Sequence, residues 1–121
     1  MTAALVVLGA IVGAPARYLV DRWITGRTAR VTGAFPWGLF VVNVSGSAIA
    51  GAVVAATTGQ LRALLLVGFC GAFTTFSGFA WESTRLWRVR RADFWLSVFA
   101  LPIASTAAFW LVWRITGILV G

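Results

Sequence analysis

The sequence predicts an all-α membrane protein with four transmembrane helices. Of its 121 residues, 60% are hydrophobic and only 11% are charged, and the mean hydropathy is +0.93. A soluble domain has roughly 25% charged residues, so this chain has too few charges to cover a water-exposed surface. Because a membrane-spanning helix takes about 20 apolar residues, four spans need about 80. We therefore expect residues 1–121 to form a single four-helix unit without a separate soluble domain.

The first apolar stretch runs from about Ala3 to Val20 and contains Gly9 and Gly13 in G-x-x-x-G spacing. Its start lacks the basic segment of a signal peptide, and Ala14-Pro15-Ala16 is a poor cleavage site because of the central proline. We interpret this stretch as a retained helix.

The remaining apolar stretches complete the count of four spans. They cover Trp37–Thr57, Leu61–Thr84 and Phe94–Val120. We expect a tight turn at Gly59-Gln60 between the second and third spans, and two arginine-containing connections at Asp21–Pro36 and Arg85–Asp93.

The charges are unevenly distributed along the chain. All ten basic residues are arginine, and a four-span chain with both termini on one side places eight of them on the opposite side. By the positive-inside rule, the first and third connections are cytoplasmic and both termini are outside. The eight are Arg17, Arg22, Arg27, Arg30, Arg85, Arg88, Arg90 and Arg91, against Arg62 and Arg114 on the terminal side.

The composition also argues against an enzyme. The chain has no histidine, so it cannot form a Ser-His-Asp triad by itself. Its only cysteine, Cys70, lies in an apolar stretch, which excludes an intrachain disulfide and a Cys/His metal site.

The second span carries a polar face. Asn43, Ser47 and Gly51 follow at intervals of four residues and share one side of a helix. An amide at membrane depth either hydrogen-bonds between helices or belongs to a transport pathway, and the spacing alone leaves both interpretations open.

The third span predicts a broken helix. Gly68, Gly71 and Gly78, together with the adjacent Thr74 and Thr75, make a poor continuous helix. A break at membrane depth frees carbonyl groups that must be buried in protein, bind an ion or face a polar cavity.

After this break, Phe76, Phe79 and Glu82 lie roughly along one stripe of the helix. Because aromatic edges carry positive partial charge, paired phenylalanine edges beside hydroxyl groups can coordinate an anion. Packing for the two phenylalanines and an interfacial position for Glu82 are the simpler interpretations.

These residues resemble a known family, the small dual-topology fluoride channels of the Fluc (CrcB) type. The segment from Gly68-Phe69-Cys70-Gly71 to Glu82 is similar to the family's G-F-x-G-G-x-T-T-F-S-T-F-x-x-E signature. Gly13-Ala14-Pro15-Ala16-Arg17-Tyr18 and Asn43 with Gly46 resemble its helix-one and helix-two motifs, so the likeness covers all four spans.

The resemblance implies a channel made of two antiparallel subunits with a structural sodium ion at their interface. Sodium would be held by the backbone carbonyls of Gly71 and Thr74 from each subunit, and Arg17 would anchor the end of helix one beside a vestibule. The implied fluoride pathway consists of Asn43, Thr75, Phe76, Ser77, Phe79 and Glu82.

Two departures from the family pattern qualify this expectation. Ala72 replaces the family's second glycine, a small change, and Gly78 replaces the threonine of S-T-F, which removes a hydroxyl that the resemblance places along the pore. The fourth span offers only Ser97, Ser105 and Thr106 as hydroxyls, in an unassigned register. In addition, an antiparallel homodimer needs balanced flanking charges, whereas eight arginines against two favour one orientation. We therefore expect a heterodimer with a homologous, oppositely oriented subunit. Alternatively, Arg17 and a few loop arginines are masked by the structure, which weakens the bias and leaves a homodimer open.

The expected function is passive export of cytoplasmic fluoride through the plasma membrane, which gives fluoride resistance. One alternative is a non-conducting partner subunit of a heterodimeric channel. Another is a small proton-coupled multidrug exporter, which the sequence disfavours because the first span carries no carboxylate.

Overall fold

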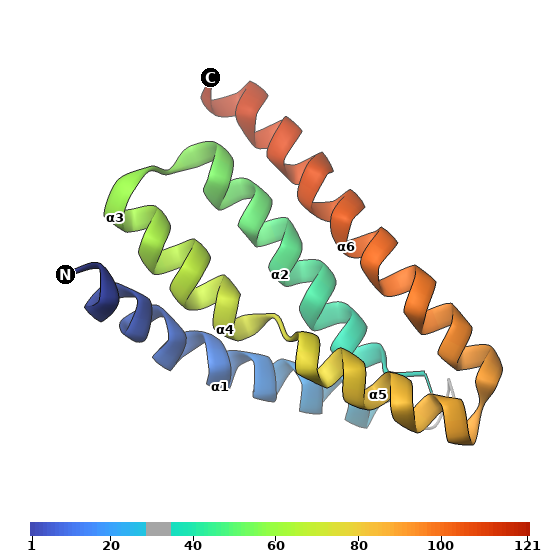
Figure 1. Ribbon diagram of the computed structural model, residues 1–121. Coiled ribbons are helices and arrows are strands. Elements are labelled where there is room, and N and C mark those ends of the chain that lie inside the picture. The colour runs from blue at the N-terminus through green and yellow to red at the C-terminus, as the bar shows by residue number, and fades with distance from the viewer. Residues whose placement is uncertain (29–34) are drawn as a thin grey trace.

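The computed structural model describes residues 1–28 and 35–121, and nearly all of these residues are helical (Figure 1). Four segments are long and apolar enough to cross a membrane, which confirms the predicted all-α, four-span fold. The elements are α1 (Thr2–Thr28), α2 (Trp37–Ala56), α3 (Gly59–Arg62), the π-helix η1 (Ala63–Cys70), α4 (Gly71–Phe73), α5 (Phe76–Val89) and α6 (Arg91–Val120). Together α3, η1, α4 and α5 make the bent third span.

The helices extend further than the apolar stretches predicted. The proposed connection Asp21–Pro36 begins inside α1, which continues to Thr28, and Arg30 falls outside the described residues. Likewise, α5 continues to Val89, and only the extended residue Arg90 separates it from α6. Arginine and tryptophan are compatible with helix, so the end of an apolar stretch does not mark the end of the helix.

The turn between the second and third spans also differs from the prediction. Thr57 and Thr58 have extended backbone conformations, and Gly59, expected within the turn, is the first residue of α3. Gly59 has a φ of 60°, a left-handed conformation that glycine adopts without a steric penalty.

The first span, α1, packs closely against η1 and α4, which lie in the N-terminal half of the third span. A Cβ atom on Gly13 would collide with the carbonyl oxygen of Phe69, and one on Gly68 would lie 2.7 Å from the carbonyl oxygen of Val6. Glycines on both helices therefore let the α1 and η1 backbones approach each other, as small residues do in membrane helix pairs.

The second span is the centre of the bundle. It contacts α1, η1 and α6, and 33% of its most apolar stretch is buried, against 11–17% in the other spans. A Cβ atom on Gly51 would collide with the carbonyl oxygen of Phe109, so α6 approaches α2 closely as well. Most apolar side chains of the other spans face outward, as a lipid environment requires.

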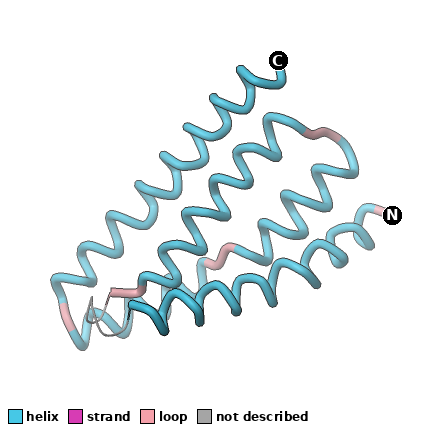
Figure 2. Tube along the Cα trace, turned by 180° about the vertical axis from the view of Figure 1, so that it is seen from behind, coloured by secondary structure: helices cyan, strands magenta, loops and turns pink. Residues whose placement is uncertain are grey.

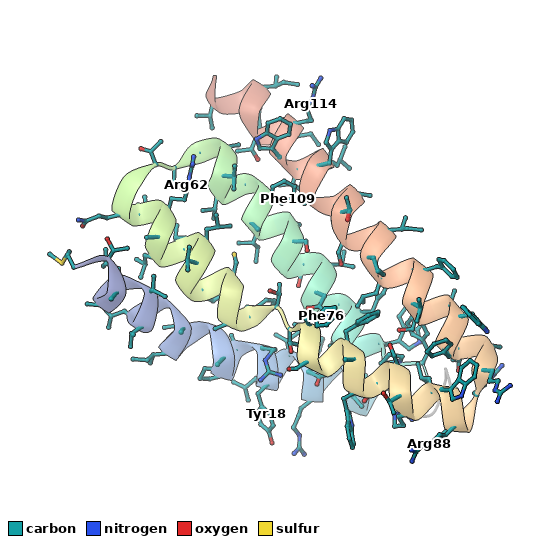
Figure 3. The ribbon with its side chains drawn as sticks, viewed as in Figure 1. Tyr18, Arg62, Phe76, Arg88, Phe109 and Arg114 are labelled. Atoms are coloured by element: carbon teal, nitrogen blue, oxygen red, sulfur yellow. The ribbon has the colours of Figure 1, made fainter. Side chains whose placement is uncertain are left out.

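Both chain termini lie at one end of the bundle, together with the turn between α2 and α3 (Figure 1, Figure 2). The connection between α5 and α6 lies at the opposite end. Figure 3 places Arg88 at this second end and both Arg62 and Arg114 at the terminal end, as the four-span arrangement requires.

Candidate functional site

The site is built around the break in the third span. Thr74 (φ −81°, ψ 158°) and Thr75 (φ −149°, ψ 125°) are extended and separate α4 from α5. The predicted break is confirmed, and it falls at the two β-branched residues. Gly68 and Gly71 remain helical, so the glycines serve close packing and the threonines form the break.

Asn43 of α2 holds the broken segment. The Thr75 backbone N–H donates to Asn43 Oδ1 at 2.9 Å, and Asn43 Nδ2 donates to the Thr75 carbonyl oxygen at 3.2 Å. Asn43, only 7% exposed, thus replaces the helical partner that the Thr75 N–H has lost and gives the Thr75 carbonyl, at the N-cap of α5, an additional donor. Its carboxamide has a second N–H that these two bonds do not use.

Threonine hydroxyls complete the local hydrogen bonding. Thr75 caps the N-terminus of α5 by accepting from the Gly78 N–H at 3.1 Å, and its hydroxyl lies 3.1 Å from that of Ser77. The Thr74 hydroxyl donates to the Cys70 carbonyl oxygen at 2.9 Å. Each threonine therefore stabilises one of the two helix ends that meet at the break.

Gly46 lets the break pack against α2. A Cβ atom at this position would collide with Thr74 Cγ2 and lie 3.0 Å from Phe73 Cδ1. Any larger residue would push the third span away and separate Asn43 from Thr75. The predicted structural position of Gly46 thus has a direct steric reason.

A groove of about 320 Å³ opens beside the break, and we call it the mid-span groove. It brings together four of the six predicted pathway residues from α2, the break and α5. Phe76 and Phe79 form one wall, with ring centroids 5.9 Å apart and planes tilted by 46°. The lining residues are Asn43, Ser47, Thr74, Thr75, Phe76, Phe79, Leu101, Pro102 and Ser105.

The other two predicted pathway residues do not line this groove. Ser77 is exposed beside Thr75. Glu82 lies about two turns further along α5, where its carboxylate forms an ion pair with Arg85 at 2.7 Å. Arg17 lies on α1, partly buried, and is also outside the groove.

The fourth span contributes Ser105, which the sequence offered only as one of three hydroxyls. Its Oγ atom is buried and has no hydrogen-bond partner among the described residues, and it lines the mid-span groove. By contrast, Ser97 is 1% exposed inside the bundle and Thr106 faces outward. The close contact between α2 and α6 fixes this register, which the sequence of α6 alone does not reveal.

The carbonyl groups at the break suit a hard cation. In a continuous helix the Gly71 carbonyl would accept from the Thr75 N–H, but that N–H donates to Asn43 instead. Main-chain oxygens are suitable ligands for an alkali or alkaline-earth ion. No group of three or more His, Cys, Asp or Glu side chains that could hold a metal ion occurs among the described residues.

Comparisons with known proteins identify the family. The model of the family described as "CrcB-like protein, Camphor Resistance (CrcB)" matches residues 4–118. A relative from Rhodococcus jostii named "Fluoride-specific ion channel FluC 2" is 45% identical over 118 residues, which cover 96% of this chain and 99% of the relative.

Two further relatives match over shorter segments. "Fluoride-specific ion channel FluC" of Koribacter versatilis is 46% identical over 83 residues, 63% of each chain. "Fluoride-specific ion channel FluC 1" of Nocardia farcinica is 48% identical over 84 residues, 69% of this chain and 57% of the relative. The match therefore spans less than two thirds of these two relatives, although it spans almost all of the first. The family model matches nearly the whole chain, and the structure has four spans with a broken third helix. This multi-pass membrane protein therefore belongs to the CrcB family.

Proposed function

We propose that this chain is a subunit of a fluoride-selective channel that lets cytoplasmic fluoride leave the cell passively and so gives fluoride resistance. The mid-span groove carries the proposal, because it gathers aromatic edges, hydroxyl groups and an amide at the middle of the bent span. The relatives named fluoride-specific ion channels support it.

The groove chemistry suits a small, strongly hydrated anion. Removing fluoride from water into hydrocarbon costs tens of kcal/mol, so the pathway must replace its hydration shell. The Ser105 hydroxyl, the second N–H of Asn43 and the edges of Phe76 and Phe79 supply donors and positive partial charge. The N-terminus of α5 also points its positive dipole end toward the break.

A second subunit completes the pathway in this proposal. Phe76 is 78% exposed on the single chain, and the mid-span groove beside it is open. A large aromatic side chain at membrane depth gains from packing against protein. We infer an antiparallel dimer in which sodium joins the carbonyl oxygens of Gly71 and Thr74 from both subunits. When bound, this ion supplies positive charge near the anion pathway.

The arginine distribution favours a heterodimer. Under the positive-inside rule, the end that carries Arg88 faces the cytoplasm and the termini face outward. A chain with this bias inserts in one direction, so its antiparallel partner has to be a paralogue with the opposite bias.

The position of Gly78 favours a conducting subunit over a silent one. A Cβ atom there would contact the side chains of Thr75 and Leu39, at 3.0 and 3.2 Å, and Gly78 is absent from the groove lining. Loss of the family hydroxyl at this position therefore leaves the groove intact. The Glu82–Arg85 ion pair argues against a proton-coupled exporter. Such an exporter needs a carboxylate in its transport site, whereas the Glu82 carboxylate is paired with an arginine and lies outside the mid-span groove.

Fluoride efflux from liposomes tests the proposal. The chain alone, a paralogue alone and the two co-expressed are reconstituted, and fluoride and chloride are measured with ion-selective electrodes. We expect fluoride efflux without chloride efflux in the co-expressed sample. Proton-dependent cation exchange without fluoride efflux would refute the channel, and full activity of the chain alone would refute the heterodimer.

A further inference from the structure

A second groove lies on the outer face of α5, away from the proposed fluoride pathway. It has a volume of about 260 Å³ and we call it the α5 outer groove. Its residues recur at intervals of three and four and so share one helix face. They are Trp81, Thr84, Arg85, Arg88 and Val89.

The walls of this groove are suited to the membrane interface. Trp81 is 72% exposed and Val89 is 63% exposed, so an indole ring and an aliphatic side chain face outward beside two guanidinium groups. Tryptophan is enriched where one end of the ring meets hydrocarbon and its N–H meets polar groups. Arg88 points away from the bundle at the end opposite both termini (Figure 3).

The groove carries unbalanced positive charge. Glu82 engages Arg85 through Nε at 2.8 Å and Nη2 at 2.7 Å. Neither of the two ion pairs found among the described residues includes Arg88. The neighbouring Arg91 lies over the Trp87 ring, 4.2 Å from its centroid, and adds a further cation to the same end of the bundle.

We propose that the α5 outer groove binds the headgroup of an anionic phospholipid. The Arg88 guanidinium and the Trp81 indole N–H donate to the phosphodiester oxygens, because a guanidinium matches phosphate geometry with paired donors. The apolar surfaces of Trp81 and Val89 then contact the glycerol and the upper acyl chain. This apolar wall favours a lipid over free phosphate, which gains nothing from an exposed indole and valine.

Lipid binding is tested on the full-length protein, purified with its partner where one is needed for stability. Native mass spectrometry measures the apparent affinity for phosphatidylglycerol, with phosphatidylcholine as the neutral lipid and inorganic phosphate as the free anion. The variants are R88Q, W81F, which keeps an aromatic ring of smaller size but removes the indole N–H, and the matched control R27Q. Arg27 is exposed on α1 over the Trp23 ring, at 4.6 Å, and is outside the groove.

We expect R88Q to weaken phosphatidylglycerol binding about fivefold, the effect of one interfacial cation on an anionic lipid, and R27Q to change it less than twofold. W81F should fall between them, and inorganic phosphate should not compete at millimolar concentration. Equal losses in R88Q and R27Q would show diffuse attraction and overturn the site. Effective competition by inorganic phosphate, or dissociation of the partner in R88Q without loss of lipid, would overturn it too. Because no readout uses fluoride, failure here is distinct from failure of the channel proposal.

Discussion

The two hydrogen bonds between Asn43 and the Thr75 backbone give the sharpest test of how the broken span is held. In N43A both bonds disappear, and the Thr75 N–H and carbonyl lose their partners from α2. Each such bond contributes about 1 kcal/mol, and a buried group left unpaired costs about 1–3 kcal/mol. Side-chain bonds in membrane proteins average nearer 0.6 kcal/mol. We therefore expect N43A to destabilise the fold by about 2 kcal/mol.

The measurement is unfolding by sodium dodecyl sulfate in mixed micelles, followed by tryptophan fluorescence. S47A is the matched control, because Ser47 lies one turn further along the same face of α2 and also lines the mid-span groove. It should change stability by less than about 0.5 kcal/mol, as substitutions away from a buried network do.

N43D separates the structural contribution of this residue from its contribution to the pathway. The aspartate keeps the oxygen that accepts from the Thr75 N–H but loses the N–H that donates to the Thr75 carbonyl, so part of the stability remains. Its negative charge repels an anion in the groove, and fluoride efflux should fall at least about tenfold, as for a repulsion of about 1.4 kcal/mol. If N43A unfolds like S47A, or if N43D conducts like the wild type, this reasoning is wrong.

Three other substitutions test separate features of the fold and the groove. R62Q should destabilise the protein by about 1–3 kcal/mol in the same unfolding assay, because Arg62 donates to two carbonyl oxygens at the C-terminal end of α2. R114Q is the control, and an equal loss of stability in both variants would show that Arg62 does not cap α2. G13A should destabilise the fold by more than about 1 kcal/mol, since the added Cβ collides with the η1 backbone, whereas the control G117A places its Cβ in open space. Unfolding curves that are the same for both variants would show that α1 can move to accommodate the methyl group. F79L should lower fluoride efflux from liposomes with little change in stability, because leucine keeps most of the side-chain volume but lacks the positive aromatic edge. Unchanged fluoride efflux would exclude the Phe79 ring edge from the pathway.

The sequence predicts the four spans and the broken helix for reasons that are local. Apolar density sets the spans, and the adjacent β-branched residues Thr74 and Thr75 lower the helix propensity at the break. The helix ends were predicted less well, because α5 continues through Arg85 and Arg88 to Val89, beyond the end of the apolar stretch. Hydropathy measures how apolar the side chains are, and it carries no information on whether the backbone hydrogen bonds of a helix continue.

The mid-span groove depends on contacts that local patterns do not encode. The spacing of Asn43, Ser47 and Gly51 predicts one polar face but not that Asn43 would bind the Thr75 backbone. Ser105 enters the groove because α2 and α6 pack closely at Gly51, which sets the rotation of α6. Which of three hydroxyls faces a pathway is thus decided by tertiary packing.

The broken helix links stability and the proposed fluoride pathway through the same residues. The two extended residues at membrane depth are stabilised by Asn43, which supplies the partner that the Thr75 N–H lacks, and by the hydroxyl bonds of Thr74 and Thr75. The same break exposes the N-terminal dipole of α5 and places Phe76 and Phe79 beside the groove. A substitution that restored a continuous helix would remove the N-terminus of α5 and change the positions of these rings relative to Asn43. We conclude that the break in the third span creates the groove, and that α2, the central helix of the bundle, carries the side chain that stabilises the break.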